Sequence, residues 1–118
     1  MEKAERIRLY EKAIKTWGEE AQVNMLDEEC GELITAIARF KRGRATHKDV
    51  LTELADVFIM TEQIATMMSY GDFEKELDRK LVRLRDEKLA KYDKKPVEWM
   101  ADSENNLDYL LDKDGDNN

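Results

Sequence analysis

Residues that end helices are few in this chain, and they fall where the apolar periodicity is interrupted. The sequence holds one proline and five glycines, and four of these mark expected helix ends: Gly18, Gly43, Gly71 and Pro96. Between them, apolar residues recur at three- and four-residue intervals, which is the spacing of one helix face. The pattern predicts helices over residues 3–17, 19–42, 47–70 and 73–92.

Two turns carry the signals of helix N-termini. Thr46 and Asp49 have the spacing of a capping box, in which each side chain accepts a hydrogen bond from the other residue's backbone N–H. Asp72, directly after Gly71, is the expected N-cap of the last helix. The turn between the second and third helices is short, so these helices are expected to be antiparallel neighbours. We therefore predict an all-α fold with an antiparallel four-helix bundle-like core.

The chain is expected to have one domain and a distinct tail. Residues 1–95 form the predicted helical domain, a length that can bury one core. Residues 96–118 form an acidic C-terminal extension, expected to be irregular, and either partly disordered or docked on a neighbouring subunit. The run Asp112–Asp116 resembles the start of a calcium-binding loop, but Asn117 stands where that loop needs glycine, so we interpret the run as an acidic end.

Charge and composition exclude several classes of partner. The net charge is −7 and no basic cluster offsets it, which argues against binding to duplex nucleic acid or to an anionic membrane. No apolar run approaches the length of a membrane helix, and none follows the N-terminal charges, so no signal peptide is expected. Cys30 is the only cysteine, so no intramolecular disulfide can form. A cytoplasmic location is expected.

Two groups of acidic residues interrupt the apolar faces of the second and third helices. Glu29 and Glu32 are three residues apart, as are Glu53 and Asp56, so each pair lies one turn apart on its helix. Carboxylates within an apolar stripe are costly unless a positive group meets them. Antiparallel helices would let the four acids face one another, and such oxygen ligands suit Mg²⁺ or Mn²⁺. The ordinary alternative for a Glu-rich helix is a solvated face.

A di-iron centre does not fit the same acids. Such a centre in a helical bundle needs two Glu-x-x-His pairs. The only histidine, His47, lies at a helix start outside both acidic groups.

The acidic pattern resembles a known signature. Glu28-Glu29-x-x-Glu32 followed by Glu53-x-x-Asp56 is similar to the EExxE…ExxD motif of the MazG-like all-α nucleoside triphosphate pyrophosphohydrolases, which are related to dimeric dUTPases and dCTP pyrophosphatases. The resemblance spans residues 17–92 and implies a homodimer or homotetramer of four or five helices. It implies Mg²⁺ ligands at Glu29, Glu32, Glu53 and Asp56. It also implies hydrolysis of a nucleoside triphosphate, in particular a dNTP, between the α and β phosphates.

Further residues are candidates for catalysis and substrate binding. Glu28 and Glu29 are the candidate catalytic residues. Glu28 points about 100° away from Glu29 on a helical wheel, where it could orient a metal-bound water or simply face solvent. Lys80 and Arg83 resemble basic positions of the family and are candidate phosphate ligands. A solvated basic helix face is an equal alternative. Two amides ahead of the motif could read a base edge or simply cap the helix: Gln22 and Asn24.

The apolar faces of the third and fourth helices are broader than one small bundle needs, so a homo-oligomer is expected. An alternative function is a non-catalytic module on the same fold that binds nucleotide or a regulatory partner without turnover.

Overall fold

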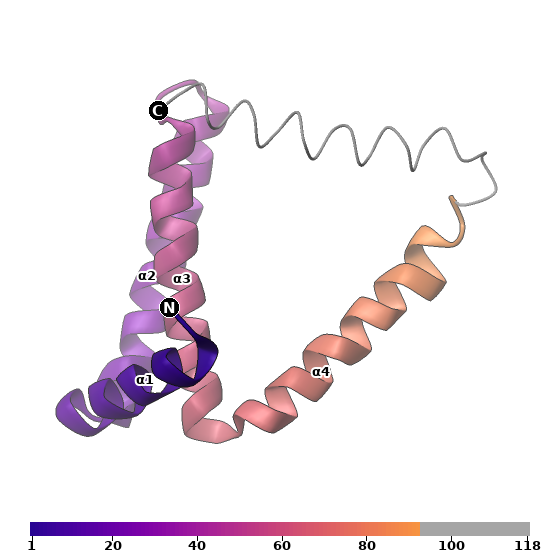
Figure 1. The fold of residues 1–118 in the computed structure, drawn as a ribbon. Coiled ribbons are helices and arrows are strands. Elements are labelled where there is room, and N and C mark those ends of the chain that lie inside the picture. The colour runs from indigo at the N-terminus through magenta and orange to yellow at the C-terminus, as the bar shows by residue number, and fades with distance from the viewer. Residues whose placement is uncertain (93–118) are drawn as a thin grey trace. The chain divides into compact units, whose positions relative to one another are not determined.

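The computed structural model describes residues 1–92, and every regular element within that range is a helix (Figure 1). The predicted all-α fold is therefore confirmed. The predicted acidic extension, with its calcium-loop-like run, lies outside the described residues. The elements are α1 (Lys3–Trp17), α2 (Glu19–Lys41), α3 (His47–Met68), α4 (Tyr70–Arg83) and a π-helix η1 (Leu84–Leu89).

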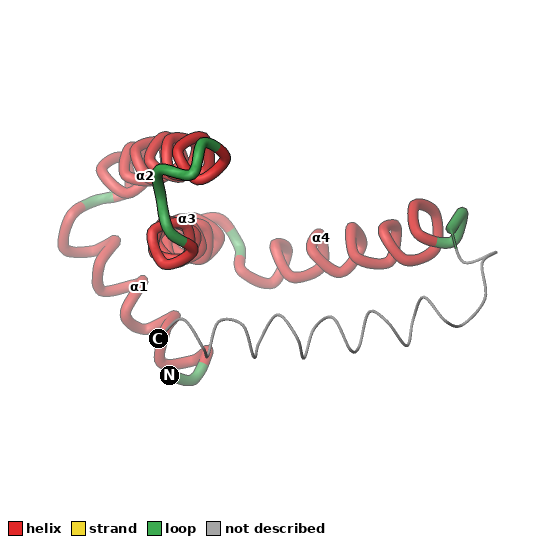
Figure 2. Tube along the Cα trace, turned by 90° about the horizontal axis from the view of Figure 1, so that it is seen from above, coloured by secondary structure: helices red, strands yellow, loops and turns green. Residues whose placement is uncertain are grey.

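The chain divides inside α4 into two compact units, the first ending at Lys75 and the second beginning at Glu76. In the first unit, α2 and α3 run antiparallel and lie side by side, and α1 packs against both (Figure 2). In the second unit, the rest of α4 continues into η1. None of the described helices is long and apolar enough to cross a membrane.

The turns at both ends of α2 follow the sequence signals. Gly18 has a φ of 92°, and its N–H donates a hydrogen bond of 2.8 Å to the carbonyl of Ile14, which ends α1. Gly43 has a φ of 71° in the next turn. The predicted capping box is confirmed, because the backbone N–H of Thr46 donates to Asp49 (2.8 Å) and that of Asp49 donates to Thr46 (3.2 Å). The second of these turns joins α2 to α3, and its shortness makes the two helices antiparallel neighbours.

The junction between α3 and α4 differs from the prediction. Helix α3 ends at Met68, and Ser69 adopts an extended backbone with a φ of −173°. The Ser69 hydroxyl accepts a hydrogen bond of 3.2 Å from the backbone N–H of Asp72. Ser69 is thus the capping residue, and the expected stop at Gly71 and cap at Asp72 were wrong. A serine can break and restart a helix because its hydroxyl satisfies a first-turn N–H.

The last predicted helix was also wrong in its bounds. Helix α4 begins at Tyr70, three residues before the expected start, and the α-helical hydrogen-bond pattern ends at Arg83. The six residues of η1 follow in a π-helical pattern. Apolar spacing alone does not distinguish these two helix types, since both leave side chains on recurring faces.

A buried carboxylate ties the first unit together. Glu62 is only 2 % exposed, and its oxygens accept hydrogen bonds from Arg6 (2.9 Å), the Tyr10 hydroxyl (2.8 Å) and the Tyr70 hydroxyl (2.5 Å). Burial alone would raise the pKa of Glu62, but the bonds from Arg6, Tyr70 and Tyr10 outweigh it and hold that pKa below its usual value. We call Arg6, Tyr10, Glu62 and Tyr70 the Glu62 network. It joins α1, α3 and the start of α4.

Candidate metal centre

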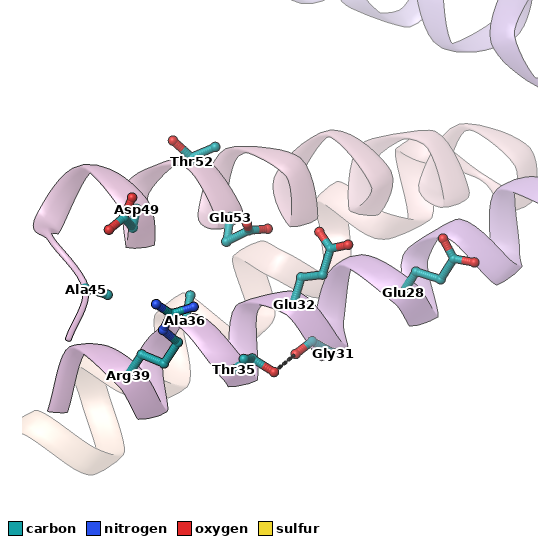
Figure 3. A pocket seen from close by; sticks show the side chains of 10 residues that line it. All are labelled: Glu28, Gly31, Glu32, Thr35, Ala36, Arg39, Ala45, Asp49, Thr52 and Glu53. Carbon is teal, nitrogen blue, oxygen red and sulfur yellow. Dashed lines mark hydrogen bonds between the residues drawn. The ribbon is translucent and has the colours of Figure 1, made fainter. Parts of the chain in front are cut away.

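An open pocket of about 740 Å³ lies along the α2–α3 pair (Figure 3). Its walls come from α2, from the turn that follows, and from the first turns of α3. The lining residues are Glu28, Gly31, Glu32, Thr35, Ala36, Arg39, Ala45, Asp49, Thr52 and Glu53.

The α2 wall is a single stripe of the helix. Glu28, Glu32, Thr35 and Arg39 follow one another at intervals of four, three and four residues, which keeps them on one face. The Thr35 hydroxyl donates a hydrogen bond of 3.0 Å to the carbonyl of Gly31, one turn earlier (Figure 3). The stripe therefore runs from two carboxylates at one end to a guanidinium at the other.

Three of the predicted metal ligands come together between the helices. Glu29 of α2 and Glu53 and Asp56 of α3 each offer a carboxylate oxygen, and these oxygens lie within 4.8 Å of one another. All three side chains are half-buried. The Oε2 atoms of Glu29 and Glu53 are buried and have no hydrogen-bond partner among the described residues. We call these three residues the acidic cluster.

Glu32 borders the acidic cluster without completing it. It is exposed, lines the pocket, and is absent from the group whose oxygens converge within 4.8 Å. Its negative charge nevertheless acts on both neighbours, Glu29 and Glu53. Of the four predicted ligands, the structure thus places three at the centre and the fourth beside them.

Two acids of the cluster, Glu29 and Glu53, hold their protons more tightly than isolated carboxyls do. Burial raises the pKa of Glu29, and the charges of Glu32, Asp56 and Glu53 raise it further. Burial likewise raises the pKa of Glu53, with Glu32 and Asp56 adding to the effect. Both causes disfavour the charged form, and the positive charge of a bound cation would offset both. The cluster therefore has the electrostatics of a cation site.

The donor set and the partnerless oxygens fit a hard divalent cation. Carboxylate oxygens are the ligands that Mg²⁺ and Mn²⁺ take in proteins, and a buried carboxylate oxygen without a donor is costly unless a cation meets it. Glu29, Glu53 and Asp56 would hold such an ion, with Glu32 within reach of the same site.

Only some of the other predicted site residues lie at the pocket. Glu28 is exposed and lines the pocket, as a residue that orients water would need to be. Gln22 is only 5 % exposed, so its amide is enclosed within the fold, whereas Asn24 is exposed and does not line this pocket. Lys80 and Arg83 belong to the second unit, where Arg83 donates to Glu87 at 3.3 Å. They stay predicted phosphate ligands.

The sequence analysis did not identify one basic residue of the pocket, Arg39. Arg39 lines it, is exposed, and forms no ion pair within the described residues. Asp49 lies nearby, and its pKa is lowered mainly by the capping bonds with Thr46 and to a lesser degree by the Arg39 charge. A signal was present in the sequence, because Arg39 follows Glu32 by seven residues and so returns to the same face.

No protein-family model matches this chain, and comparison with curated proteins and with solved structures finds no match either. The interpretation of the site rests on its own residues and on the resemblance of its acidic motif.

Proposed function

We propose that this protein is a Mg²⁺-dependent nucleoside triphosphate pyrophosphohydrolase of the MazG-like type. It would hydrolyse its substrate between the α and β phosphates, giving a nucleoside monophosphate and pyrophosphate. The single observation that carries the proposal is the acidic cluster, in which Glu29 and Glu53 keep buried oxygens without partners beside an open pocket. Mn²⁺ could replace Mg²⁺ at such a site.

The charges of the site favour a cation-bound substrate. A triphosphate and the acidic cluster are both negative, so they can approach only through a cation, or through basic residues at the pocket wall. When bound, the ion supplies Lewis-acid polarisation of the phosphoryl oxygens and a water of lowered pKa. Arg39, at the far end of the α2 stripe, can pair with phosphate oxygens that the ion does not contact.

The chain's own residues have separable roles in this proposal. Glu29, Glu53 and Asp56 hold the ion, and Glu32 adds negative charge beside it. Glu28, exposed on the same wall, can orient the attacking water and accept its proton. Phosphoryl transfer of this kind depends on positioning and electrostatics more than on a covalent nucleophile. That dependence agrees with a pocket whose lining includes no cysteine, histidine or serine.

The proposed substrate, location and assembly are those expected from the sequence. The substrate class is a nucleoside triphosphate, in particular a dNTP, and the role is removal of unwanted nucleotides in the cytoplasm. Lys80 and Arg83 are proposed to add phosphate contacts. A homodimer or homotetramer is the proposed assembly.

A direct test measures pyrophosphate release from a panel of dNTPs and NTPs, with Mg²⁺ and with EDTA. We expect release only with the metal, and at least about a 100-fold loss of kcat in Glu53→Gln, since one of three cation ligands is lost. The matched control is Glu20→Gln, an exposed acid elsewhere on α2, which should keep full activity. Nucleotide binding without any product would instead favour a non-catalytic module, and full activity of Glu53→Gln would contradict the metal assignment.

A further inference from the structure

A second cavity lies between α1 and α3, within the first unit. Its volume is about 560 Å³, which is in the range of sites for small organic molecules, and it shares no lining residue with the pocket beside the acidic cluster. Along α1 it extends at least from Leu9 to Trp17, about 12 Å of helix. We call it the α1–α3 cavity. The proposed hydrolysis makes no use of it.

Most of the wall of the α1–α3 cavity is apolar. Leu9, Ala13 and Trp17 follow one another at intervals of four residues and so lie on one face of α1, and α3 adds Ile59. Three of these side chains are uncovered in the described chain, with exposed fractions of 49 % for Leu9, 66 % for Trp17 and 42 % for Ile59. The indole of Trp17 offers a flat surface on which a ring can stack. The wall therefore suits a flat apolar body.

One polar side chain is enclosed in this apolar wall without a partner. Gln63 lies one helical turn after Ile59 and lines the cavity, although it is only 6 % exposed. Its Oε1 atom is buried and accepts no hydrogen bond among the described residues. Buried amide oxygens nearly always have a donor, because an unpaired one loses its water without replacement. An amide oxygen only accepts, so the group that is missing beside Gln63 is an N–H or O–H donor.

The other polar groups at the cavity are already paired, with one exception. Arg6 and Tyr10 donate hydrogen bonds to Glu62, at 2.9 and 2.8 Å. The Thr16 hydroxyl donates to the backbone carbonyl of Lys12 at 2.7 Å. The Lys12 ammonium itself is exposed and forms no ion pair within residues 1–92. Although the chain has a net charge of −7, no acidic residue is among the described residues that line this cavity, so its free charge is positive.

We infer that the α1–α3 cavity binds a small aromatic acid with a ring N–H group. The ring would lie against the apolar wall beside Trp17, its N–H would donate to Oε1 of Gln63, and its acidic group would pair with Lys12. A hydrocarbon or a fatty acid would leave Gln63 without a donor. A nucleoside triphosphate would bring several negative charges to a cavity with one free cation in its described lining.

Binding at the α1–α3 cavity is independent of the acidic cluster. The two sites have no residue in common, and the cavity needs neither Mg²⁺ nor nucleotide. Arg6 and Tyr10 belong both to its lining and to the Glu62 network, so a bound acid would stabilise the packing of α1 on α3. Failure of the aromatic acid to bind would leave the hydrolase proposal standing, and the reverse also holds.

The test is a titration of the full chain in EDTA, without nucleotide, followed by ligand-observed NMR. The probe is indole-3-acetate, which has a flat apolar ring, one ring N–H and a carboxylate. Benzofuran-3-acetate is the matched ligand, since an oxygen replaces the N–H. We expect indole-3-acetate to bind with a dissociation constant on the order of 1 mM or below, as suits its size, and at least about fivefold tighter than the benzofuran. No binding of indole-3-acetate at about 5 mM, or equal binding of the two acids, would overturn the inference.

Two variants assign the contacts. Gln63→Leu keeps the size of the side chain and removes the partnerless oxygen, so it should fold at least as stably as the wild type and bind the two acids equally, within about twofold. Lys12→Gln, an exposed change on α1, should weaken binding of indole-3-acetate about threefold. Its matched control is Lys15→Gln, which should keep wild-type binding because Lys15 is exposed on α1 and does not line the cavity. A Gln63→Leu protein that keeps the wild-type preference, or a response to Lys15 and not to Lys12, would overturn the inference.

A competition experiment separates the aromatic acid from a nucleotide as the occupant. Each of the four dNTPs, at about 1 mM in EDTA, should leave indole-3-acetate bound. Displacement by a dNTP would make the α1–α3 cavity part of a nucleotide site and would overturn the inference of a separate ligand.

Discussion

Helix α3 carries two carboxylates nine residues apart, Glu62 fully buried and Glu53 half-buried, and their surroundings are opposite in kind. Glu62 accepts hydrogen bonds from Arg6, Tyr10 and Tyr70, and its pKa is held below the usual value. Glu53 keeps a buried oxygen that meets no donor among the described residues, and its pKa is raised by burial and by neighbouring acids. One carboxylate is satisfied by the fold, and the other is not.

The difference separates an acid that holds the fold together from one that is a candidate cation ligand. A buried carboxylate that accepts hydrogen bonds from two other segments locks all three segments together. Carboxylates gathered without donors cost stability, and folds keep such clusters where they bind ions or do chemistry. The Glu62 network therefore explains how α1 and the start of α4 are held, and the acidic cluster is the part of the fold that a cation would complete.

The largest effect is expected when the charge of Glu62 is removed. Glu62→Gln removes the charge that satisfies Arg6 and weakens the acceptor for Tyr10 and Tyr70. We expect the free energy of unfolding in urea to fall by about 1–3 kcal/mol, because charge-assisted hydrogen bonds to the buried carboxylate are replaced by weaker ones to an amide. Glu20→Gln should change it by less than about 0.5 kcal/mol. A Glu62→Gln protein as stable as the wild type would show that the network is not structural.

The opposite change is expected at the acidic cluster. Glu53→Gln relieves repulsion with Asp56 and Glu32, so it should raise the melting temperature of the metal-free protein. Added Mg²⁺ should raise the melting temperature of the wild type and leave that of Glu53→Gln almost unchanged. Differential scanning fluorimetry with and without EDTA measures both effects. A metal-free Glu53→Gln protein that melts below the wild type would mean that this carboxylate stabilises the fold.

The two groups should also respond to pH with opposite signs. The pKa of Glu62 is lowered, so its contribution to stability is present above the ordinary value of 4.5 and is lost as the pH falls through the lowered pKa. The pKa values of Glu29 and Glu53 are raised, so the folded protein binds more protons than the unfolded chain above pH 4.5. The contribution of Glu29 and Glu53 to stability therefore falls as the pH rises from 4.5 through their raised pKa values.

Stability of the metal-free protein, measured by urea unfolding across pH 3–8, checks this prediction. Glu53→Gln should flatten the loss above pH 4.5, and Glu62→Gln should flatten the loss below it. Saturating Mg²⁺ should change the loss of stability above pH 4.5 and leave the loss below pH 4.5 unchanged. Curves that change together in both variants would contradict the separation.

Features set by residues close together in the sequence could be predicted, and features set by contacts between residues far apart in the sequence could not. The span of α1, the capping box of Thr46 and Asp49, and the acids of the motif are set by residues within a few positions of one another. The convergence of Glu29 with Glu53 followed from the short turn between antiparallel helices. These features depend on spacing, which a sequence shows directly.

The Glu62 network could not be read in the same way. Glu62 is one of 27 acidic residues, and two of its donors, Arg6 and Tyr10, are 56 and 52 residues away along the chain. Only packing of α1 on α3 brings them together. The restart of the helix at Ser69 was missed for a related reason, since Gly71 carried the stronger local signal although the hydroxyl of Ser69 made the cap.

Binding of a divalent cation by the acidic cluster is the property on which the proposed function most depends. Titration of the metal-free protein with Mn²⁺, followed by electron paramagnetic resonance of the free ion, measures this directly and without any substrate. We predict saturable binding by the wild type and by Glu20→Gln, and at least about tenfold weaker binding by Glu53→Gln, which removes one of the converging ligands. Equal binding by wild type and Glu53→Gln, or none by either, would contradict the account.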